Sequence, residues 1–508
     1  MYVIDWLAKQ RALRPDKIAL VDLATERRIT YRNLDERTSR CAEFLRGVWK
    51  IEPGERVALL APNCTDYVEL LYACARIGAP LVCLNWRLSV EENIGVLADS
   101  GATALVFGAE FDVQARALAS ARRIDRLLRI GAAADGAPGY EDVLAARSGR
   151  AIEMPARPMN ETWYLLYTSG TTGKPKGVIQ TYGMTFFNGV NAMHAAKLSR
   201  DDVFLSVLPY FHTGGLNLYL NPLLQAGATT YVMKQFDVER TMELLERDVT
   251  MFFGVPAIYL FLSQHPRFAQ ADFSRVRAWA CGGAPIADTL LQQYMAKGIT
   301  ICTGFGMTET GPTVFLADED TARRKVGCVG RPVTYALTKV VDGAGRELGP
   351  NQPGELLIKG PGITPGYWNN PEATRAAFQD GWLRSGDIAY YDDDGDYYIV
   401  DRSKDMYISG GENVYPAEVE NVLVQIDGVA EAAVIGVADE KWGEVGKAIV
   451  APKPGATLTA EAITTFCRKR LAGYKVPKHV QFIAELPRNA VGKVSKPTLR
   501  EMHAAKRA

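Results

Sequence analysis

Short apolar segments alternate with helical patterns from residue 17 onward, and this alternation limits the fold more than any other feature. IALVD, RVALLAP and APLVCLN read as strands, and helical patterns begin at Tyr31 and at Asp66. A strand, helix and strand order needs crossover connections, which place parallel strands in a sheet covered on both faces. We therefore expect residues 17 to 110 to form a first parallel α/β subdomain.

A second set of apolar strands begins near Trp163. Each strand ends in Gly, Pro or Thr, as expected where strands leave a sheet. The strands are WYLLYTSG, DVFLSVLP, TTYVM, TMFFGVP, RAWACGG and ITICTGFG. They predict a second doubly wound subdomain.

The pattern changes twice in the remaining chain. From about Val326, short strands with Asp-Gly and Pro-Gly turns indicate antiparallel hairpins or a small β-barrel. Beyond Lys404, the order helix, strand, strand, helix and strand indicates a small independent α+β domain. The expected fold is α/β, with a large N-terminal domain over residues 1–403 and a small C-terminal domain over 404–508.

Composition excludes several classes of protein. The chain has 508 residues, and its 58 Lys and Arg balance its 58 Asp and Glu, so no overall field attracts nucleic acid. Its eight cysteines form no CxxC pair, which is typical of reduced, buried thiols. No secretory leader and no transmembrane run is recognisable, so we expect a cytoplasmic protein.

YTSGTTGKPKGV, at 167–178, combines three glycines, two lysines and a run of hydroxyl side chains directly after an apolar strand. Exposed backbone N–H groups and hydroxyls in such a loop could surround phosphate oxygens. A Walker loop is excluded, because Pro175 follows Lys174 where Ser or Thr is required. The alternative is a flexible surface loop with solvated lysines.

The segment resembles the phosphate loop of the adenylate-forming (AMP-binding) superfamily, which includes acyl-CoA synthetases, and similar motifs follow in the expected order from about residue 10 to 500. The resemblance implies that the C-terminal domain is a mobile lid, with its hinge at Lys404. It also implies that this loop binds ATP through Thr168, Ser169, Gly170, Thr171, Thr172, Gly173 and Lys176.

Three further motifs match the family's nucleotide and acyl sites. LPYFHTGGL implies that His212 lies beside the acyl pocket, and ACGGAPI that Gly283, Ala284 and Pro285 contact adenine. TGFGMTET implies an adenine and phosphate site made by Gly304, Phe305, Gly306, Met307 and Thr308, with Glu309 as the Mg²⁺ ligand. One carboxylate suffices, because Mg²⁺ fills its shell with water and phosphate oxygens. Phe305 replaces the family's commoner Tyr, and stacking survives that change.

The C-terminal motifs complete the resemblance. Asp387 and Arg402 would bind the ribose, whereas Gly410, Gly411 and Trp442 would line the CoA path. Lys493 in PRNAVGKVSKP matches the lysine that the family brings over the acyl and α-phosphate oxygens. The tail departs from the family here, since VSKPTLR replaces an arginine-rich segment, which leaves its anchoring open. The acids Asp392, Asp393, Asp394 and Asp396 are expected in a hairpin turn.

The resemblance implies an ATP-dependent carboxylic acid:CoA ligase that releases AMP and pyrophosphate through an acyl-adenylate. Its catalytic residues would be Lys493, Thr172, Glu309 and His212. A fatty or aryl acid is expected in a pocket formed by Phe187, His212, Phe253, Gly282, Gly306 and Val314. Two alternatives stay open: an adenylation enzyme that loads a carrier-protein thiol, and a non-catalytic ATP-binding regulator. Monomer and homodimer are not distinguished.

Overall fold

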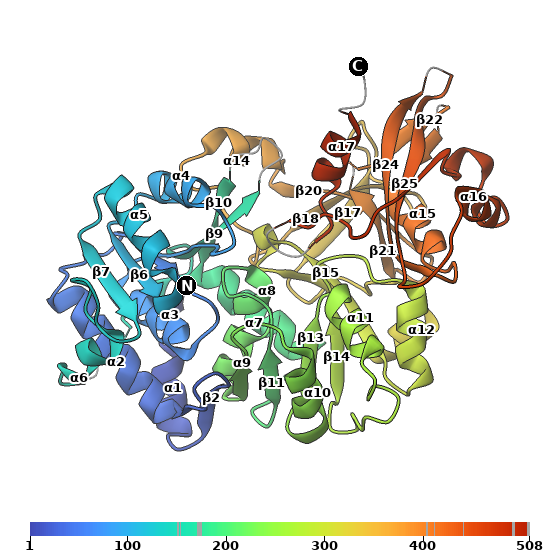
Figure 1. Ribbon diagram of the computed structural model, residues 1–508. Coiled ribbons are helices and arrows are strands. Elements are labelled where there is room, and N and C mark those ends of the chain that lie inside the picture. Colours follow the sequence, from blue (N-terminus) through green and yellow to red (C-terminus); the bar gives the residue numbers. More distant parts are fainter. Residues whose placement is uncertain are drawn as a thin grey trace.

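The computed structural model of the protein (Figure 1) describes residues 1–149, 152, 154–169, 175–402, 405–410, 412–439, 441–489 and 493–504, without the side chains of Ser169, Arg402 and Ala504. Over these ranges the chain forms two α/β subdomains, a small antiparallel sheet and a C-terminal α+β module. Figure 1 shows this module, in orange and red, beside the small sheet and across from the blue first subdomain.

The first large sheet has the order β10-β9-β5-β4-β6-β7 in the described part of the chain. Its strands are parallel except β10, which forms an antiparallel pair with β9. The strands are β4 (Val57–Leu60), β5 (Leu81–Cys83), β6 (Ala104–Gly108), β7 (Arg126–Ile130), β9 (Thr162–Ser169) and β10 (Pro175–Thr181).

The second large sheet has the order β16-β15-β14-β13-β11-β12-β2-β3, again for the described residues. Its central strands are parallel and both edge strands are antiparallel to their neighbours. The strands are β2 (Ile18–Asp22), β3 (Arg28–Thr30), β11 (Val203–Ser206), β12 (Thr229–Val232), β13 (Met251–Gly254), β14 (Ala278–Cys281), β15 (Ile301–Gly306) and β16 (Thr313–Leu316).

The two subdomains exchange strands, and the expected division of the chain near Trp163 is wrong in this respect. β2 precedes the first set but pairs with β12 of the second sheet, and β9 begins the second set but pairs with β5 of the first. Apolar patterning fixes which segments are strands, but it cannot assign a strand to a sheet when both sheets are buried on both faces. The exchange ties the two subdomains into one body.

Helix α3 (Thr65–Ile77) lies where the two sheets meet, and every one of its residues is buried. It ends at Gly78, whose φ of 74° suits a glycine C-cap. The other helices of the N-terminal part are α1 (Trp6–Leu13), α2 (Tyr31–Gly47), α4 (Val90–Ser100), α5 (Asp112–Arg122), α6 (Tyr140–Ala145), α7 (Tyr182–Ala195), α8 (Thr213–Leu216), α9 (Leu220–Ala226), α10 (Val238–Arg247), α11 (Pro256–Gln264), α12 (Asp288–Ala296), α13 (Glu319–Arg324) and α14 (Pro371–Ala377), with short 3-10 turns η1 (Ala109–Phe111) and η2 (Thr308–Thr310).

The small sheet confirms the hairpins expected after Val326. It contains β17 (Leu337–Val341), β18 (Gly354–Lys359), β19 (Phe378–Gln379), β20 (Trp382–Tyr391) and β21 (Tyr397–Arg402), all paired antiparallel. A two-stranded ladder joins β1 (Tyr2–Val3) to β8 (Arg157–Pro158).

The C-terminal module has its own apolar core, built around Val419, Val434, Val450 and Ile463. Its elements are β22 (Tyr407–Ser409), β23 (Glu412–Val414), α15 (Pro416–Leu423), β24 (Val429–Asp439), β25 (Gly443–Pro452), α16 (Ala460–Arg468), η3 (Gly473–Lys475), β26 (His479–Phe482) and α17 (Lys496–Ala504). A separate core of this kind is expected of a unit that can move as one body.

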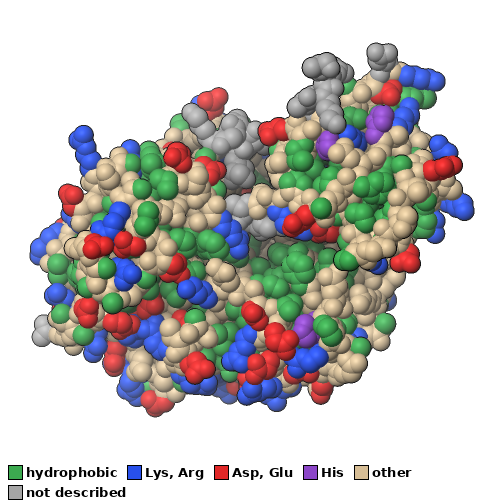
Figure 2. All heavy atoms as spheres, viewed as in Figure 1, with side chains coloured by type: hydrophobic (Ala, Val, Ile, Leu, Met, Phe, Trp, Pro, Cys, Tyr) green, Lys and Arg blue, Asp and Glu red, His purple; other side chains and the backbone are tan. Residues whose placement is uncertain are grey.

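The described helices include none that combines the length and the apolar character of a membrane span. Basic and acidic side chains are interspersed over the face shown in Figure 2, in line with the balanced composition.

Candidate active site

The strands β9 and β10 flank the Gly/Thr-rich loop as an antiparallel hairpin. Lys176 lies opposite Thr168 in this register. The hydroxyl of Tyr167 donates a hydrogen bond to Asp99 Oδ2 at 2.6 Å, which anchors the end of β9 to α4. The predicted phosphate contacts Gly170, Thr171, Thr172 and Gly173 lie outside the described residues, as does the side chain of Ser169.

Glu309 follows β15 in η2 and is 7% exposed. Its Oε1 accepts a hydrogen bond from the hydroxyl of Tyr367 at 2.8 Å, and its carbonyl oxygen accepts one from the N–H of Thr364 at 2.8 Å. Gln180 Nε2 donates to the carbonyl oxygen of Thr308 at 2.9 Å. The turn that carries Thr308 and Glu309 is therefore held by β10 and by the segment around residue 364.

Tyr367 belongs to this site, and sequence reasoning missed it. It lies opposite Val178 of β10, and the ammonium of Lys176 lies 5.3 Å from the centroid of its ring. GYWNNPEA carries no glycine-rich or charged pattern that marks a site. Tyr367 can be recognised as part of the site only in the folded chain, where it lies next to Val178 of β10, almost 190 positions earlier in the sequence.

The turn after β14 carries the expected adenine contacts. Gly283 has a φ of 83°, which favours glycine, and Gly283, Ala284 and Pro285 are exposed. A Cβ atom at Gly283 would lie 4.0 Å from Lys493 Nζ. The structure thus brings Lys493 of the C-terminal module to the predicted nucleotide site.

Several contacts fix the segment that carries Lys493. Its N–H donates to Asn489 Oδ1 at 3.0 Å, and its carbonyl accepts from the N–H of Asn489 at 2.8 Å. Lys496 pairs with Glu420 at 2.9 Å and Arg500 with Asp405 at 2.8 Å. These ion pairs, one from a lysine and one from the remaining arginine, anchor the tail.

His212 lies at the N-terminus of α8, after β11. Its Nε2 is buried and has no hydrogen-bond partner among the described residues. Burial, together with the positive charges of Lys493 and Arg87, lowers the pKa of His212 to about 3. A neutral imidazole near Lys493 can accept a hydrogen bond at neutral pH without adding charge.

The acyl-pocket candidates are only partly brought together. Phe253 is buried, and a Cβ atom at Gly282 would lie 3.4 Å from its ring. The Phe187 ring lies 5.1 Å from that of Tyr335. Val314 is 1% exposed and packs in the core of the small sheet, not with Phe253. A Cβ atom at Gly306 would lie 1.7 Å from the carbonyl oxygen of Pro312, so glycine is required there.

The ribose candidates lie on neighbouring strands. Asp387 of β20 is 8% exposed and pairs in register with Arg402 of β21. The N–H of Asp387 donates to Ser385 Oγ at 3.1 Å, which orients this part of the strand. The Arg402 side chain, Lys404 and Gly411 lie outside the described residues.

Phe305, the residue expected to stack on adenine, packs near Phe315, with ring centroids 6.1 Å apart.

Trp442 and Gly410 form a second cluster on the C-terminal module. Gly410 has a φ of 62°, and its N–H donates to the carbonyl of Trp442 at 2.9 Å. The ammonium groups of Lys441 and Lys478 each lie 5.0 Å from the Trp442 ring. Two ammonium groups thus lie near the ring of a partly exposed tryptophan.

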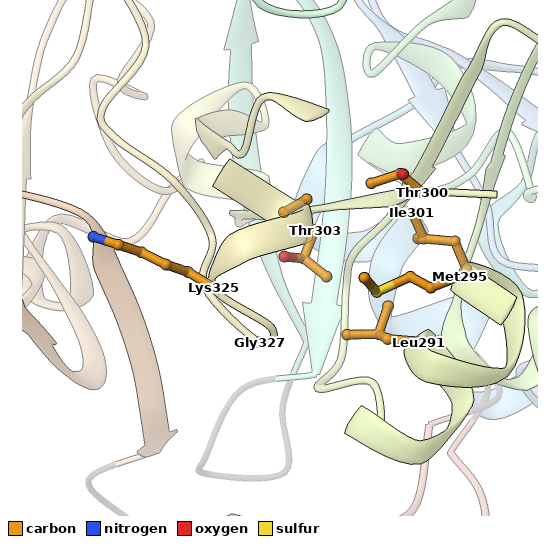
Figure 3. Close-up of a pocket in the computed structure, with 8 residues that line it drawn as sticks. Leu291, Met295, Thr300, Ile301, Thr303, Lys325 and Gly327 are labelled. Carbon is orange, nitrogen blue, oxygen red and sulfur yellow. The ribbon is translucent and has the colours of Figure 1, made fainter. Parts of the chain in front are cut away.

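A small hollow under β15 is not part of this site. It is lined by Leu291, Met295, Ile301 and Thr303, and Figure 3 shows Lys325 extending away from them. Lys325 Nζ instead contacts three carboxylates of the β20–β21 turn, those of Asp392, Asp394 and Asp396, at 2.6 to 2.7 Å. These acids therefore form the expected hairpin turn, with an ammonium group at its centre.

Comparison with known proteins matches residues 7–368 to the AMP-binding enzyme family and residues 418–493 to the AMP-binding enzyme C-terminal domain. A feruloyl-CoA synthase from an Amycolatopsis species is 40% identical over 97% of this chain and 98% of its own. The long-chain-fatty-acid–CoA ligase FadD13 of Mycobacterium tuberculosis is 39% identical over 99% of both chains. The o-succinylbenzoate CoA synthetase of Bacillus subtilis, solved with ATP and magnesium, superposes with a TM-score of 0.87 at 32% identity, over 98% of this chain and all of that one.

Proposed function

The chain belongs to the AMP-binding enzyme family, and from this premise we propose that it joins an aromatic carboxylic acid to coenzyme A through an acyl-adenylate. The named relatives are a CoA synthase and a CoA ligase, and each matches this chain over nearly its whole length. Both therefore share the acid–thiol ligase activity. The single observation that carries the proposal is the position of Lys493. It lies at the turn of Gly283, with His212 and its neutral imidazole nearby.

The first half-reaction brings two anions together, so the protein must reduce their repulsion. We assign this task to the ammonium groups of Lys176 and Lys493, with the hydroxyls of Thr168 and Thr172. One carboxylate oxygen of the acid attacks the α-phosphorus of ATP, and the bond from that phosphorus to pyrophosphate breaks. The chain needs no nucleophile of its own for this step.

Glu309 would hold the magnesium ion that accompanies ATP. The fit is chemical: Mg²⁺ prefers carboxylate oxygens and needs only one or two from the protein. Glu309 is a nearly buried carboxylate, and its Oε1 accepts a hydrogen bond from the neutral hydroxyl of Tyr367. Bound there, the ion would neutralise phosphate charge.

The second half-reaction needs Lys493 to leave and the thiol to enter. We propose that residues 404–508 rotate about Lys404 relative to 1–403, which would bring Gly410, Gly411 and Trp442 to the CoA path. The thiol of CoA then attacks the carbonyl carbon of the mixed anhydride, and AMP departs with one former carboxylate oxygen. Asp387 and Arg402 are proposed to hold the ribose in both steps, and adenine to lie between Phe305 and the turn of Gly283 to Pro285.

An aromatic acid suits the acyl-side residues better than a long aliphatic one. Gly282 leaves bare backbone beside the Phe253 ring, and Phe187 and Tyr335 add two rings in mutual contact. Aromatic side chains favour an aryl group, which packs against them in offset or edge-to-face geometry. The similarity to the feruloyl-CoA synthase supports an aromatic acid. The nearly equal similarity to the fatty-acid ligase makes a long aliphatic acid the competing proposal. We expect the enzyme to act in the cytoplasm, as a monomer or a homodimer.

A substrate panel tests the proposal. The purified chain would be incubated with ATP, Mg²⁺, CoA and single acids of three kinds: benzoates, hydroxycinnamates, and aliphatic acids from short to long. Acyl-CoA and AMP would be quantified by mass spectrometry, with a phosphopantetheinyl carrier protein replacing CoA in parallel. The proposal predicts the highest kcat/KM for an aromatic acid with CoA. A higher value for a long aliphatic acid, or transfer to the carrier protein alone, would refute it.

A further inference from the structure

We propose that Tyr367 is a positioning residue for adenylation: its hydroxyl fixes the carboxylate of Glu309 while its ring holds the ammonium of Lys176. The inference rests on the proposed function, because it assigns the two charged groups to the magnesium and phosphate side of the ATP site. It adds one residue that joins them.

The backbone around Tyr367 is locked to the strand that leaves the phosphate loop. The N–H of Trp368 donates to the carbonyl of Gly177 at 2.7 Å, and the N–H of Ile179 donates to that of Gly366 at 3.2 Å. Tyr367 and Val178 face each other as an isolated bridge between these bonds. A shift of β10 therefore moves Tyr367 with it.

A second set of contacts holds the same segment to the turn of Glu309. The N–H of Thr364 donates to the carbonyl of Glu309 at 2.8 Å, and Thr364 Oγ1 donates to the carbonyl of Ile179 at 2.7 Å. The N–H of Tyr367 donates to Thr374 Oγ1 at 3.0 Å in α14. Residues 364–368 thus connect β10, η2 and α14, and Tyr367 is fixed on its backbone as well as at its hydroxyl.

The chemistry of a tyrosine suits a residue between these two charges. Its hydroxyl donates at 2.8 Å to Glu309 and carries no charge, so it orients the carboxylate without neutralising it. An arginine or lysine there would compete with a cation for the same carboxylate. The face of the ring attracts Lys176, whose Nζ lies 5.3 Å from its centroid. A phenol hydroxyl is protonated at neutral pH, so it can donate to the carboxylate.

The two halves of Tyr367 can be separated by substitution. Tyr367→Phe removes the bond to Glu309 and keeps the ring under Lys176, whereas Tyr367→Leu removes both. Tyr140→Phe is the matched control, because the Tyr140 hydroxyl also donates to a buried carboxylate, that of Glu69, at 3.1 Å. This pair lies in the first subdomain and is not part of the candidate site. Thermal unfolding and circular dichroism would establish that each variant is folded.

The direct readout is metal affinity. Free Mn²⁺ would be measured by electron paramagnetic resonance in the presence of the enzyme and a non-hydrolysable ATP analogue. Tyr367→Phe is expected to raise the Mn²⁺ dissociation constant about 10-fold, the lower end of the usual effect of losing a partner of a metal ligand. Tyr367→Leu is expected to weaken binding of the analogue as well. In the adenylation assay, Tyr367→Phe should raise the Mg²⁺ concentration that gives half the maximal rate.

Three outcomes overturn the inference: unchanged Mn²⁺ affinity in folded Tyr367→Phe, an equal loss in Tyr140→Phe, or an unchanged Mg²⁺ requirement. Failure of the proposed function is distinguishable, because the wild-type chain would then form no acyl-adenylate with any acid. Should Tyr367→Leu fail to fold, Tyr367→Phe alone decides the question.

Discussion

Lys496 Nζ lies 2.9 Å from Glu420 Oε1, three residues after Lys493, and Glu420 Oε1 also accepts the N–H of Val434 at 2.7 Å. This pair ties the first turn of α17 to α15 and β24, and so fixes the segment that presents Lys493.

Replacing Lys496 by methionine should misplace Lys493 and slow acyl-adenylate formation about 10- to 100-fold, the usual cost of moving a reacting group by about 1 Å. Lys453→Met is the matched control, since its exposed ammonium pairs with Asp427 at 3.8 Å on the same module. Stopped-flow release of pyrophosphate measures the first half-reaction, and thioester formation from supplied acyl-adenylate measures the second. Equal losses in both half-reactions would contradict this role for the Lys493 segment.

Lys176 and Thr172 are expected to serve the first half-reaction, in which pyrophosphate leaves. Lys176→Met and Thr172→Val should therefore lower acyl-adenylate formation far more than conversion of ready-made adenylate to thioester. Lys359→Met is a control that removes another lysine from the face of an aromatic ring, that of Trp382 at 5.8 Å. A variant of Lys176 or Thr172 with the larger defect in thioester formation would argue against a phosphate-binding loop.

His212 should remain neutral over the working pH range. Burial, with help from Lys493 and Arg87, lowers its pKa to about 3. The unfolded chain takes up this proton near pH 6.5 and the folded chain does not, so His212 costs stability as pH falls from about 6.5 toward 3. At pH 5 this cost is on the order of 2 kcal/mol.

NMR of the His Cε1–H signals, assigned with His212→Gln, checks this prediction. The His212 signal should keep its chemical shift from pH 5 to 8. A titration midpoint between pH 6 and 7 would show that the imidazole is not sheltered as the structure has it.

Gly306→Ala should disable the site without unfolding the chain. The added Cβ atom would lie 1.7 Å from the carbonyl of Pro312, which forces the turn leading to Thr308 and Glu309 to move. Loss of adenylation by at least 100-fold is expected, with a modest fall in Tm. Gly47→Ala is the control, because a Cβ atom there would meet nothing within 4 Å. It should leave the adenylation rate and the Tm unchanged. Activity near wild type in Gly306→Ala would mean that this turn does not carry the ATP site.

The elements of the fold were predicted well from the sequence, because an apolar run that ends in Gly, Pro or Thr forms a strand whichever sheet it joins. Helix α2, expected to begin at Tyr31, runs from Tyr31 to Gly47. The assignment of β2 and β9 to sheets was wrong, since strand pairing depends on contacts far apart in the chain.

The roles of Glu309 and Lys493 were expected from motifs that resemble those of the family, and they stay predictions. Tyr367 and Gln180 were missed, because each contacts the turn of Thr308 and Glu309 by a hydrogen bond to a residue far away in the sequence. The Lys496–Glu420 pair was missed for the same reason, although the changed tail sequence marked the place where an anchor was needed.

The central claim is that the acid is activated as an acyl-adenylate, and the fate of its oxygen tests this most directly. The acid labelled with ¹⁸O in both carboxylate oxygens would be converted with ATP and CoA, and the products separated for mass spectrometry. The account predicts one ¹⁸O in AMP, one in the acyl-CoA carbonyl and none in pyrophosphate. Label in inorganic phosphate together with ADP, or AMP without label, would contradict it.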